Sequence, residues 1–220
     1  MNISYRLVII IAVFITCLIT ANIIAVKLVG LGPFTLPAAI FVFPLSYIFG
    51  DILTEVYGYH MARRVIWLAF ACNLIFVFCA WVGQLLPPAS FWEGQAAYEG
   101  ILGYAPRLLA ASFCGYLAGE FANSYVLSRL KILTKGRWLW SRTIGSTLVG
   151  EGLDSAIFIT LAFAGTPAFA AIFIVYHWLA KTAIEVALTP ATYAIVNYLK
   201  RKEGIDSYDY KTRFNPFLIS

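Results

Sequence analysis

The chain has 220 residues, of which 61% are hydrophobic and 12% are charged. Soluble domains carry about 25% charged residues, so this chain has too little charge to cover a water-facing surface and is not an ordinary soluble domain. Its net charge of +5 does not indicate nucleic-acid binding, because the basic residues stand in short clusters between long apolar runs, as in membrane proteins.

Apolar runs of about 20 residues are long enough to cross a bilayer as helices. We therefore predict an all-α, polytopic membrane protein with a transmembrane domain over residues 1–202 and a polar tail over 203–220, which we expect to be poorly ordered. The predicted spans are 7–26, 34–53, 65–86, 106–127, 143–164 and 168–199. The first run is too long for a signal-peptide core, so we expect it to be retained.

Prolines interrupt two of these runs. Pro37 and Pro44 predict that part of the second span is broken or irregular, which is tolerated at membrane depth where the chain lines a cavity. Pro190 predicts a kink in the last span.

Lysine and arginine set the expected orientation. They concentrate in alternate connections, at residues 6, 63–64, 129–142 and 200–213, whereas the other connections hold only Lys27 and Arg107. By the positive-inside rule, both termini face the cytoplasm, and the loop 88–104 faces outward.

Several ionisable residues lie inside the predicted spans. Each costs about 2.5–3.5 kcal/mol at a helix centre, so a chain that keeps several of them usually does so for function. Because residues three or four apart share a helix face, the polar residues form one stripe on each of four spans. These stripes are Asp51 and Glu55; Glu120 and Asn123; Glu151 and Asp154; and His177, Lys181 and Glu185.

A purely structural interpretation competes with a functional one. Lys181 could pair with Glu151 or Asp154 only to lock helices together. One lysine cannot neutralise those two acids together with Glu120 and Glu185, however, so a polar cavity at mid-membrane depth is the stronger prediction.

The remaining candidates leave alternatives open. His177 lies nearer the outer side, where a structural role and ligand contact are both open. Asp51 and Glu55 lie near the cytoplasmic boundary, where they form either part of the site or an interfacial salt-bridge cluster with Arg63 and Arg64.

Intramembrane catalysis is the rival class of function. The sequence has no HExxH zinc motif, no GxSxG nucleophile motif and no phosphate-binding glycine loop. The four cysteines show no metal-binding spacing. We therefore expect no catalytic residues, no metal and no cofactor.

Three segments resemble the queuosine precursor transporter family, also called the vitamin uptake transporter family. They are FVFPLSYIFGDILTEVYGYHMARR at 41–64, AGEFANSYVLSRLK at 118–131 and WSRTIGSTLVGEGLDSAIF at 140–158. The resemblance extends over roughly residues 7 to 200, and Lys181 also fits it. It implies a six-helix architecture similar to the substrate-binding S components of ECF transporters.

The resemblance also implies a substrate. The implied substrates are 7-cyano-7-deazaguanine and/or 7-aminomethyl-7-deazaguanine. The resemblance implies that the protein imports them across the bacterial inner membrane for salvage into tRNA queuosine, with no direct contact to nucleic acid. On this hypothesis Asp154 or Glu151 accepts hydrogen bonds from the guanine-like edge. Lys181 holds a carboxylate or contacts O6, and Glu120 and Asn123 complete the wall of the site.

Two alternatives stay open: a substrate-binding subunit for another vitamin or purine-like ligand that needs an energising partner, and an intramembrane enzyme. The energy source, the preferred precursor and the oligomeric state are not determined by the sequence.

Overall fold

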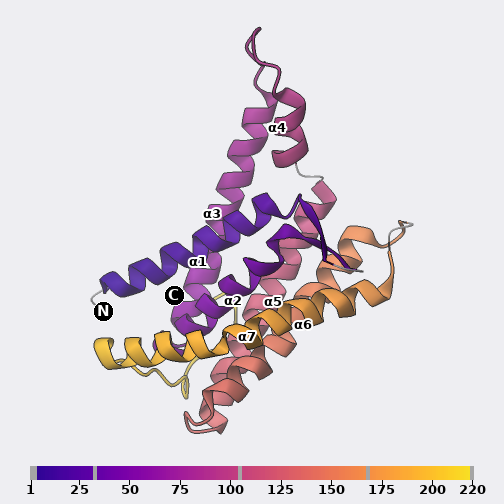
Figure 1. The fold of residues 1–220 in the computed structure, drawn as a ribbon. Coiled ribbons are helices and arrows are strands. Elements are labelled where there is room, and N and C mark those ends of the chain that lie inside the picture. Colours follow the sequence, from indigo (N-terminus) through magenta and orange to yellow (C-terminus); the bar gives the residue numbers. More distant parts are fainter. Residues whose placement is uncertain (1–3, 32–33, 104–105, 167–168, 219–220) are drawn as a thin grey trace.

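The computed structural model describes residues 4–31, 34–103, 106–166 and 169–218, so the predicted start of the last span, residue 168, lies outside the described residues. Within these described residues, seven α-helices, a two-stranded hairpin and two short turns of other helix types follow one another (Figure 1). In chain order they are α1 (Tyr5–Ile24), β1 (Leu28–Leu31), β2 (Phe34–Pro37), η1 (Ala38–Phe41), α2 (Phe43–Ile52), η2 (Leu53–Tyr57), α3 (Tyr59–Leu85), α4 (Gln95–Leu102), α5 (Pro106–Leu133), α6 (Leu139–Phe163) and α7 (Ala171–Glu203).

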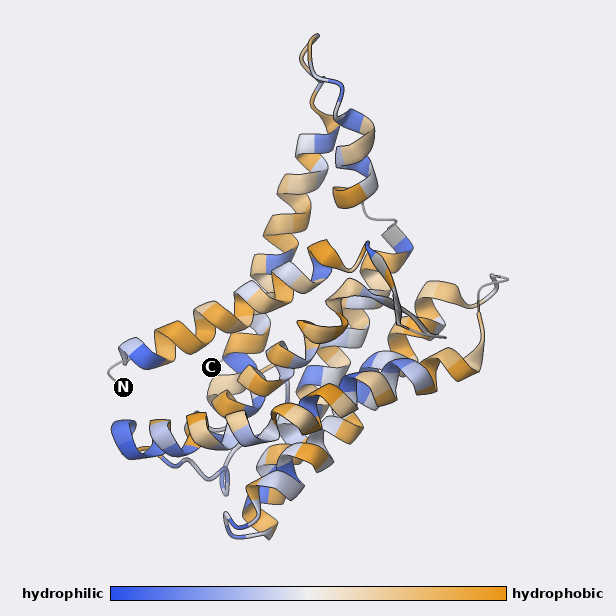
Figure 2. Cartoon of the chain, viewed as in Figure 1, coloured by the Kyte–Doolittle hydropathy of each residue, from blue (hydrophilic) through white to orange (hydrophobic). Residues whose placement is uncertain are grey.

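Among the described residues, six helical segments are long and apolar enough to cross a membrane. Hydrophobic residues predominate along α1 and α3 (Figure 2), and large side chains such as Ile75 and Phe78 are more than half exposed. Exposed apolar side chains on this scale are stable only against lipid. The structure thus confirms the prediction of an all-α bundle with six helices of transmembrane length. The short α4 packs beside the far end of α3 (Figure 1), within the predicted outer loop.

The second predicted span is irregular, as its prolines indicated. The prediction of helix from residue 34 was wrong, because residues 34–37 form β2, which pairs antiparallel with β1. Pro37 disfavours a helical conformation at the preceding residue, which keeps this segment extended. The segment then forms η1, α2 with Pro44 in its first turn, and η2, a single π-helical turn.

The helices α5 and α6 form a tight antiparallel pair. Their closest approach is at Gly119 and Gly150, where a Cβ on either glycine would lie within 3 Å of the other residue's carbonyl oxygen. Small residues at such a crossing let helix backbones pack closely in a membrane. This contact brings the polar stripes of α5 and α6 face to face.

The polar tail folds back under the bundle, contrary to the expectation that it is poorly ordered. The Asp209 carboxylate accepts hydrogen bonds from the Tyr59 backbone N–H at 2.9 Å and from the Ser128 hydroxyl at 2.7 Å. Arg63 donates to the carbonyl oxygens of Arg213 and Asn215. Buried polar groups on α3 and α5 need hydrogen-bond partners, and the tail supplies them.

Gly58 makes this docking possible. It joins η2 to α3 with φ of 86°, a conformation that favours glycine, and a Cβ there would lie 3.2 Å from the Asp209 carboxylate. The close approach of the tail therefore depends on the missing side chain.

We expect Asp209→Ala to release the tail. The substitution leaves the Tyr59 N–H and the Ser128 hydroxyl without their acceptor, at a cost of about 1–3 kcal/mol. Detergent-solubilised variant should unfold at a lower temperature, and its C-terminal segment should be cleaved faster by a non-specific protease. The exposed neighbour Lys211→Ala is the control; equal cleavage of both variants would contradict tail docking.

Candidate functional site

In the part of the chain that the structure describes, five carboxyl groups from four helices meet in the interior with a single ammonium group. We call this set the acidic core. Every member has at most 4% of its surface exposed. The members are Asp51 of α2, Glu120 of α5, Glu151 and Asp154 of α6, and Lys181 and Glu185 of α7.

Lys181 lies between the two acids of α6. Its ammonium group forms an ion pair and hydrogen bond with the Asp154 carboxylate, and lies 3.0 Å from Oε2 of Glu151. It also lies 4.3 Å from the centre of the Phe43 ring, a cation–π contact. Because Glu151 and Asp154 are three residues apart on one helix face, one cation reaches both.

Two further acids are held by neutral groups. The Asn123 amide donates to Oδ1 of Asp51 at 2.7 Å, and the Thr147 hydroxyl donates to Oε1 of Glu185. Each of these acids keeps its second oxygen without a hydrogen-bond partner. Neutral donors lessen the cost of burying a carboxyl group but do not balance its charge.

Glu120 differs from the other four acids because, within the described residues, it has neither an ion pair nor a hydrogen bond, and it is fully buried. Neither oxygen of Glu151 has a hydrogen-bond partner in the described structure, but Glu151 pairs with the Lys181 ammonium group. The carboxyl group lies against Gly50, where any Cβ would overlap it, and near the Phe14 ring of α1. Asn123 Oδ1 and the Tyr47 hydroxyl are buried nearby, also without partners. The acidic core therefore has spare hydrogen-bonding capacity and is closed to solvent.

The structure brings together all five of the main predicted site residues, together with Asp51. His177 borders this set, one helical turn before Lys181 on α7, where its Nδ1 is 3.0 Å from the Ser155 hydroxyl and its ring lies 6.0 Å from that of Phe158. These contacts agree with a structural role for His177.

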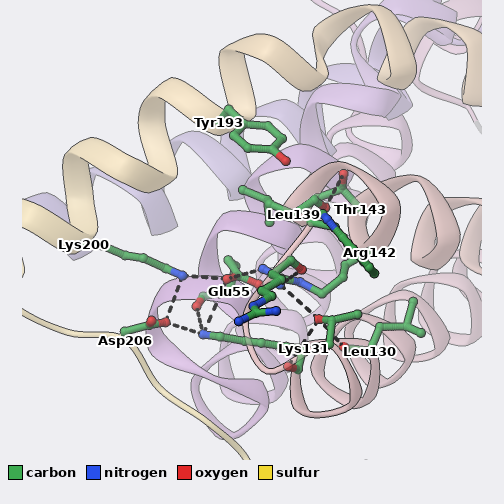
Figure 3. Close-up of polar contacts among 12 residues, drawn as sticks. Glu55, Leu130, Lys131, Leu139, Arg142, Thr143, Tyr193, Lys200 and Asp206 are labelled. Atoms are coloured by element: carbon green, nitrogen blue, oxygen red, sulfur yellow. Dashed lines mark hydrogen bonds and ion pairs between the residues drawn. The ribbon is translucent and has the colours of Figure 1, made fainter.

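Glu55 also lies apart, in a second charged group that we call the basal cluster. Its Oε1 is 2.8 Å from Nη2 of Arg142, 2.6 Å from Nζ of Lys200 and 3.6 Å from Nζ of Lys131 (Figure 3). Asp206 of the tail bridges the two lysines at 2.5 and 2.9 Å. Glu55 thus ties η2 to α5, α6 and α7 at the end of the bundle that the tail covers.

The two residues of the predicted Asp51–Glu55 stripe therefore serve different clusters, and Arg63 donates to the tail. The π-helical turn begins after Asp51 and breaks the regular spacing that would keep the two acids on one face. Sequence reasoning assigned Lys131, Arg142 and Lys200 only to membrane orientation. Arg142 and Lys131 are in fact buried, at 1% and 2% exposed, and nothing local in the sequence distinguishes them from surface charges.

Asp206 illustrates the electrostatics of the basal cluster outside the membrane-spanning segments. Burial alone raises its pKa, but hydrogen bonds from Lys131 and Lys200 outweigh burial and hold the pKa below its ordinary value. The charged form of Asp206 is therefore favoured. Its ion pairs stabilise the folded state at neutral pH, and this stabilisation is lost as the pH falls through the lowered pKa.

Comparison with known proteins gives a consistent picture. Residues 37–195 match the model of a family described as "Putative vitamin uptake transporter". No solved structure matches the chain.

Three curated relatives are similar over most of the chain. A protein of Bacillus subtilis named "Probable queuosine precursor transporter" is 31% identical over 84% of this chain and 82% of its own length. The "Queuosine precursor transporter" of Escherichia coli is 28% identical over 71% of this chain and 64% of its own length. A Haemophilus influenzae protein with the same name as the first is 26% identical, over 73% of this chain and 68% of its own length.

We expect Glu55→Gln to destabilise the bundle far more than Asp206→Asn. Removing the Glu55 charge takes the carboxylate partner from the buried Arg142, which costs about 3–5 kcal/mol. The Asp206 side chain is 43% exposed, so its loss costs at most about 1 kcal/mol. The unfolding temperatures of both variants in detergent at neutral pH test this expectation. A smaller loss of stability for Glu55→Gln than for Asp206→Asn would contradict the central role of Glu55.

Proposed function

Because the chain belongs to the vitamin uptake transporter family, we propose that it imports a queuosine precursor across the bacterial inner membrane. The substrates are 7-cyano-7-deazaguanine and 7-aminomethyl-7-deazaguanine, taken up for salvage into tRNA queuosine. The observation that carries this proposal is the acidic core, in which Lys181 lies between Glu151 and Asp154 in the interior of a six-helix membrane bundle. The names of the relatives supply the substrate class.

The chemistry of the site suits a deazaguanine. Its guanine-like edge presents a ring N–H and an exocyclic amino group, both donors, and carboxylates accept such hydrogen bonds strongly. We assign this edge to Asp154 and Glu151, which lie side by side on α6. Lys181 then donates to the O6 acceptor, or holds one of the two carboxylates in position. The free Oδ1 of Asn123 is a further acceptor.

The site also suits discrimination between substrates. Buried polar groups that the ligand leaves unpaired cost binding energy, so a site of this kind rejects analogues that lack the donors. Hypoxanthine-like analogues without the exocyclic amino group are therefore expected to bind poorly.

A transport cycle requires the acidic core to open. In this structure the core is sealed by the α5–α6 contact at Gly119 and Gly150 and by α2. We infer that the basic end of the bundle, where the tail and the basal cluster lie, faces the cytoplasm and that both termini lie on that side. The structure then represents a closed state between two open ones.

Salvage in cells tests the proposal. A bacterial host that lacks both deazaguanine synthesis and its own importer would express the chain, receive each precursor, and be assayed for queuosine in tRNA. We expect the chain to restore queuosine and Asp154→Asn and Lys181→Ala to lose it. Each substitution removes a charge-assisted hydrogen bond and unbalances the remaining charges, which weakens substrate binding at least about 10- to 100-fold.

The exposed acid Glu93 provides the matched control, because Glu93→Gln makes the same kind of exchange outside the acidic core. Equal amounts of each variant in the membrane must be verified. Normal salvage by Asp154→Asn would overturn the site assignment, and no salvage by abundant wild-type protein would overturn the substrate class. Salvage in cells without uptake by purified protein in liposomes would indicate a separate energising partner.

A further inference from the structure

The charges of the acidic core do not balance. Within the described part of the chain, five buried carboxyl groups meet one ammonium group. An ionised carboxylate that is buried without a compensating charge costs several kcal/mol, and such groups take up a proton instead. Lys181 compensates Asp154 and Glu151 in part, so the closed core must hold protons on the other acids.

Glu120 is the member whose protonation the geometry determines most clearly. Within the described structure both of its oxygens lack hydrogen-bond partners, and the carboxyl group occupies the space that a Cβ on Gly50 would take. The groups that interact with it electrostatically come from four helices. They are Tyr47 and Asp51 of α2, Tyr116 of α5, Glu151 and Asp154 of α6, and Lys181 and Glu185 of α7. The acids outnumber the single cation, so this surrounding also favours the neutral form.

We propose that Glu120 is a proton-binding site whose proton is taken up when the acidic core closes and given up when it opens. The proton moves between water and the carboxyl group, which passes from COO⁻ to COOH and back, with no other reactant. A glutamate side chain in water has a pKa of about 4.3. Glu120 therefore releases its proton when the acidic core opens to water at neutral pH. The transporter then carries a proton as a second ligand in its cycle. This role rests on the proposed transport function and replaces the expectation that Glu120 contacts the substrate.

The position of Glu120 fits this role. It follows Gly119 on α5, and its carboxyl group lies against Gly50 of α2, one of the helices that close the core. Charging Glu120 places an unpaired anion in this close contact, whereas a neutral carboxyl group fits there. Closure is therefore coupled to proton uptake where α5 packs against α2.

Stability against pH tests the site without any substrate. Each proton that unfolding or opening releases lowers the closed-to-open ratio about tenfold for every pH unit of increase. We expect wild-type protein in detergent to lose thermal stability between about pH 5 and pH 8. Glutamine is neutral at every pH and has the same shape as glutamic acid. Glu120→Gln should therefore reduce the dependence of stability on pH by the contribution of one proton, and Glu93→Gln should leave that dependence unchanged. An identical slope in Glu120→Gln and wild type would overturn the proposal.

Exchange in liposomes tests the role in transport. Purified protein would exchange external labelled for internal unlabelled 7-cyano-7-deazaguanine, at equal pH on both sides. Wild-type exchange should slow as the pH rises, while Glu120→Gln should keep its rate across the same range. Loss of the pH dependence in His177→Gln instead would move the proton site to His177 and overturn the proposal. Absence of exchange in every variant, with the stability slope as expected, would contradict the transport function and leave the proton site standing.

Discussion

A buried charge in a membrane needs a partner, and in this bundle the scarce partner is the cation. Lys181 is the one ammonium group in the acidic core, and it holds two acids of the neighbouring helix. This pairing fixes how α6 and α7 face each other. It also leaves Asp51, Glu120 and Glu185 to be satisfied by neutral donors or by protons.

The basal cluster has the opposite balance. There three cations, Lys131, Arg142 and Lys200, converge on Glu55, and the tail adds Asp206. One carboxylate contacted by several cations is a strong, fixed connection between helices. A cluster with one cation and several carboxyl groups can instead change its net charge, because its carboxyl groups can bind or release protons. The bundle thus has a rigid end, closed by the tail, and a central region whose protonation and hydration can vary.

This difference suits an importer. In the proposed transport cycle, substrate binding in the centre replaces some internal contacts of Asp154 and Glu151, while the fixed end keeps the helices in register. The tight glycine contact between α5 and α6 closes the centre without a large side chain, so modest helix movements are enough to open it.

Much of this was contained in the sequence. Six apolar runs, the alternation of basic connections, and acids spaced three or four apart determine an all-α membrane bundle with a polar centre, because hydropathy and helical period are local properties. The stripes of Glu120 and Asn123, Glu151 and Asp154, and Lys181 and Glu185 could be predicted to meet for the same reason.

Only the tertiary structure decided the rest. The strand at 34–37 forms because β1 lies opposite it, and the π-helical turn sends Asp51 and Glu55 to different clusters. In the sequence, Lys131 and Arg142 resemble ordinary basic residues at helix ends, but in the structure both are buried beside Glu55, which is distant in the chain. The tail is ordered by hydrogen bonds to Tyr59, Arg63 and Ser128, which lie far earlier in the chain. These features depend on contacts between residues distant in sequence, whose pairing no local pattern records.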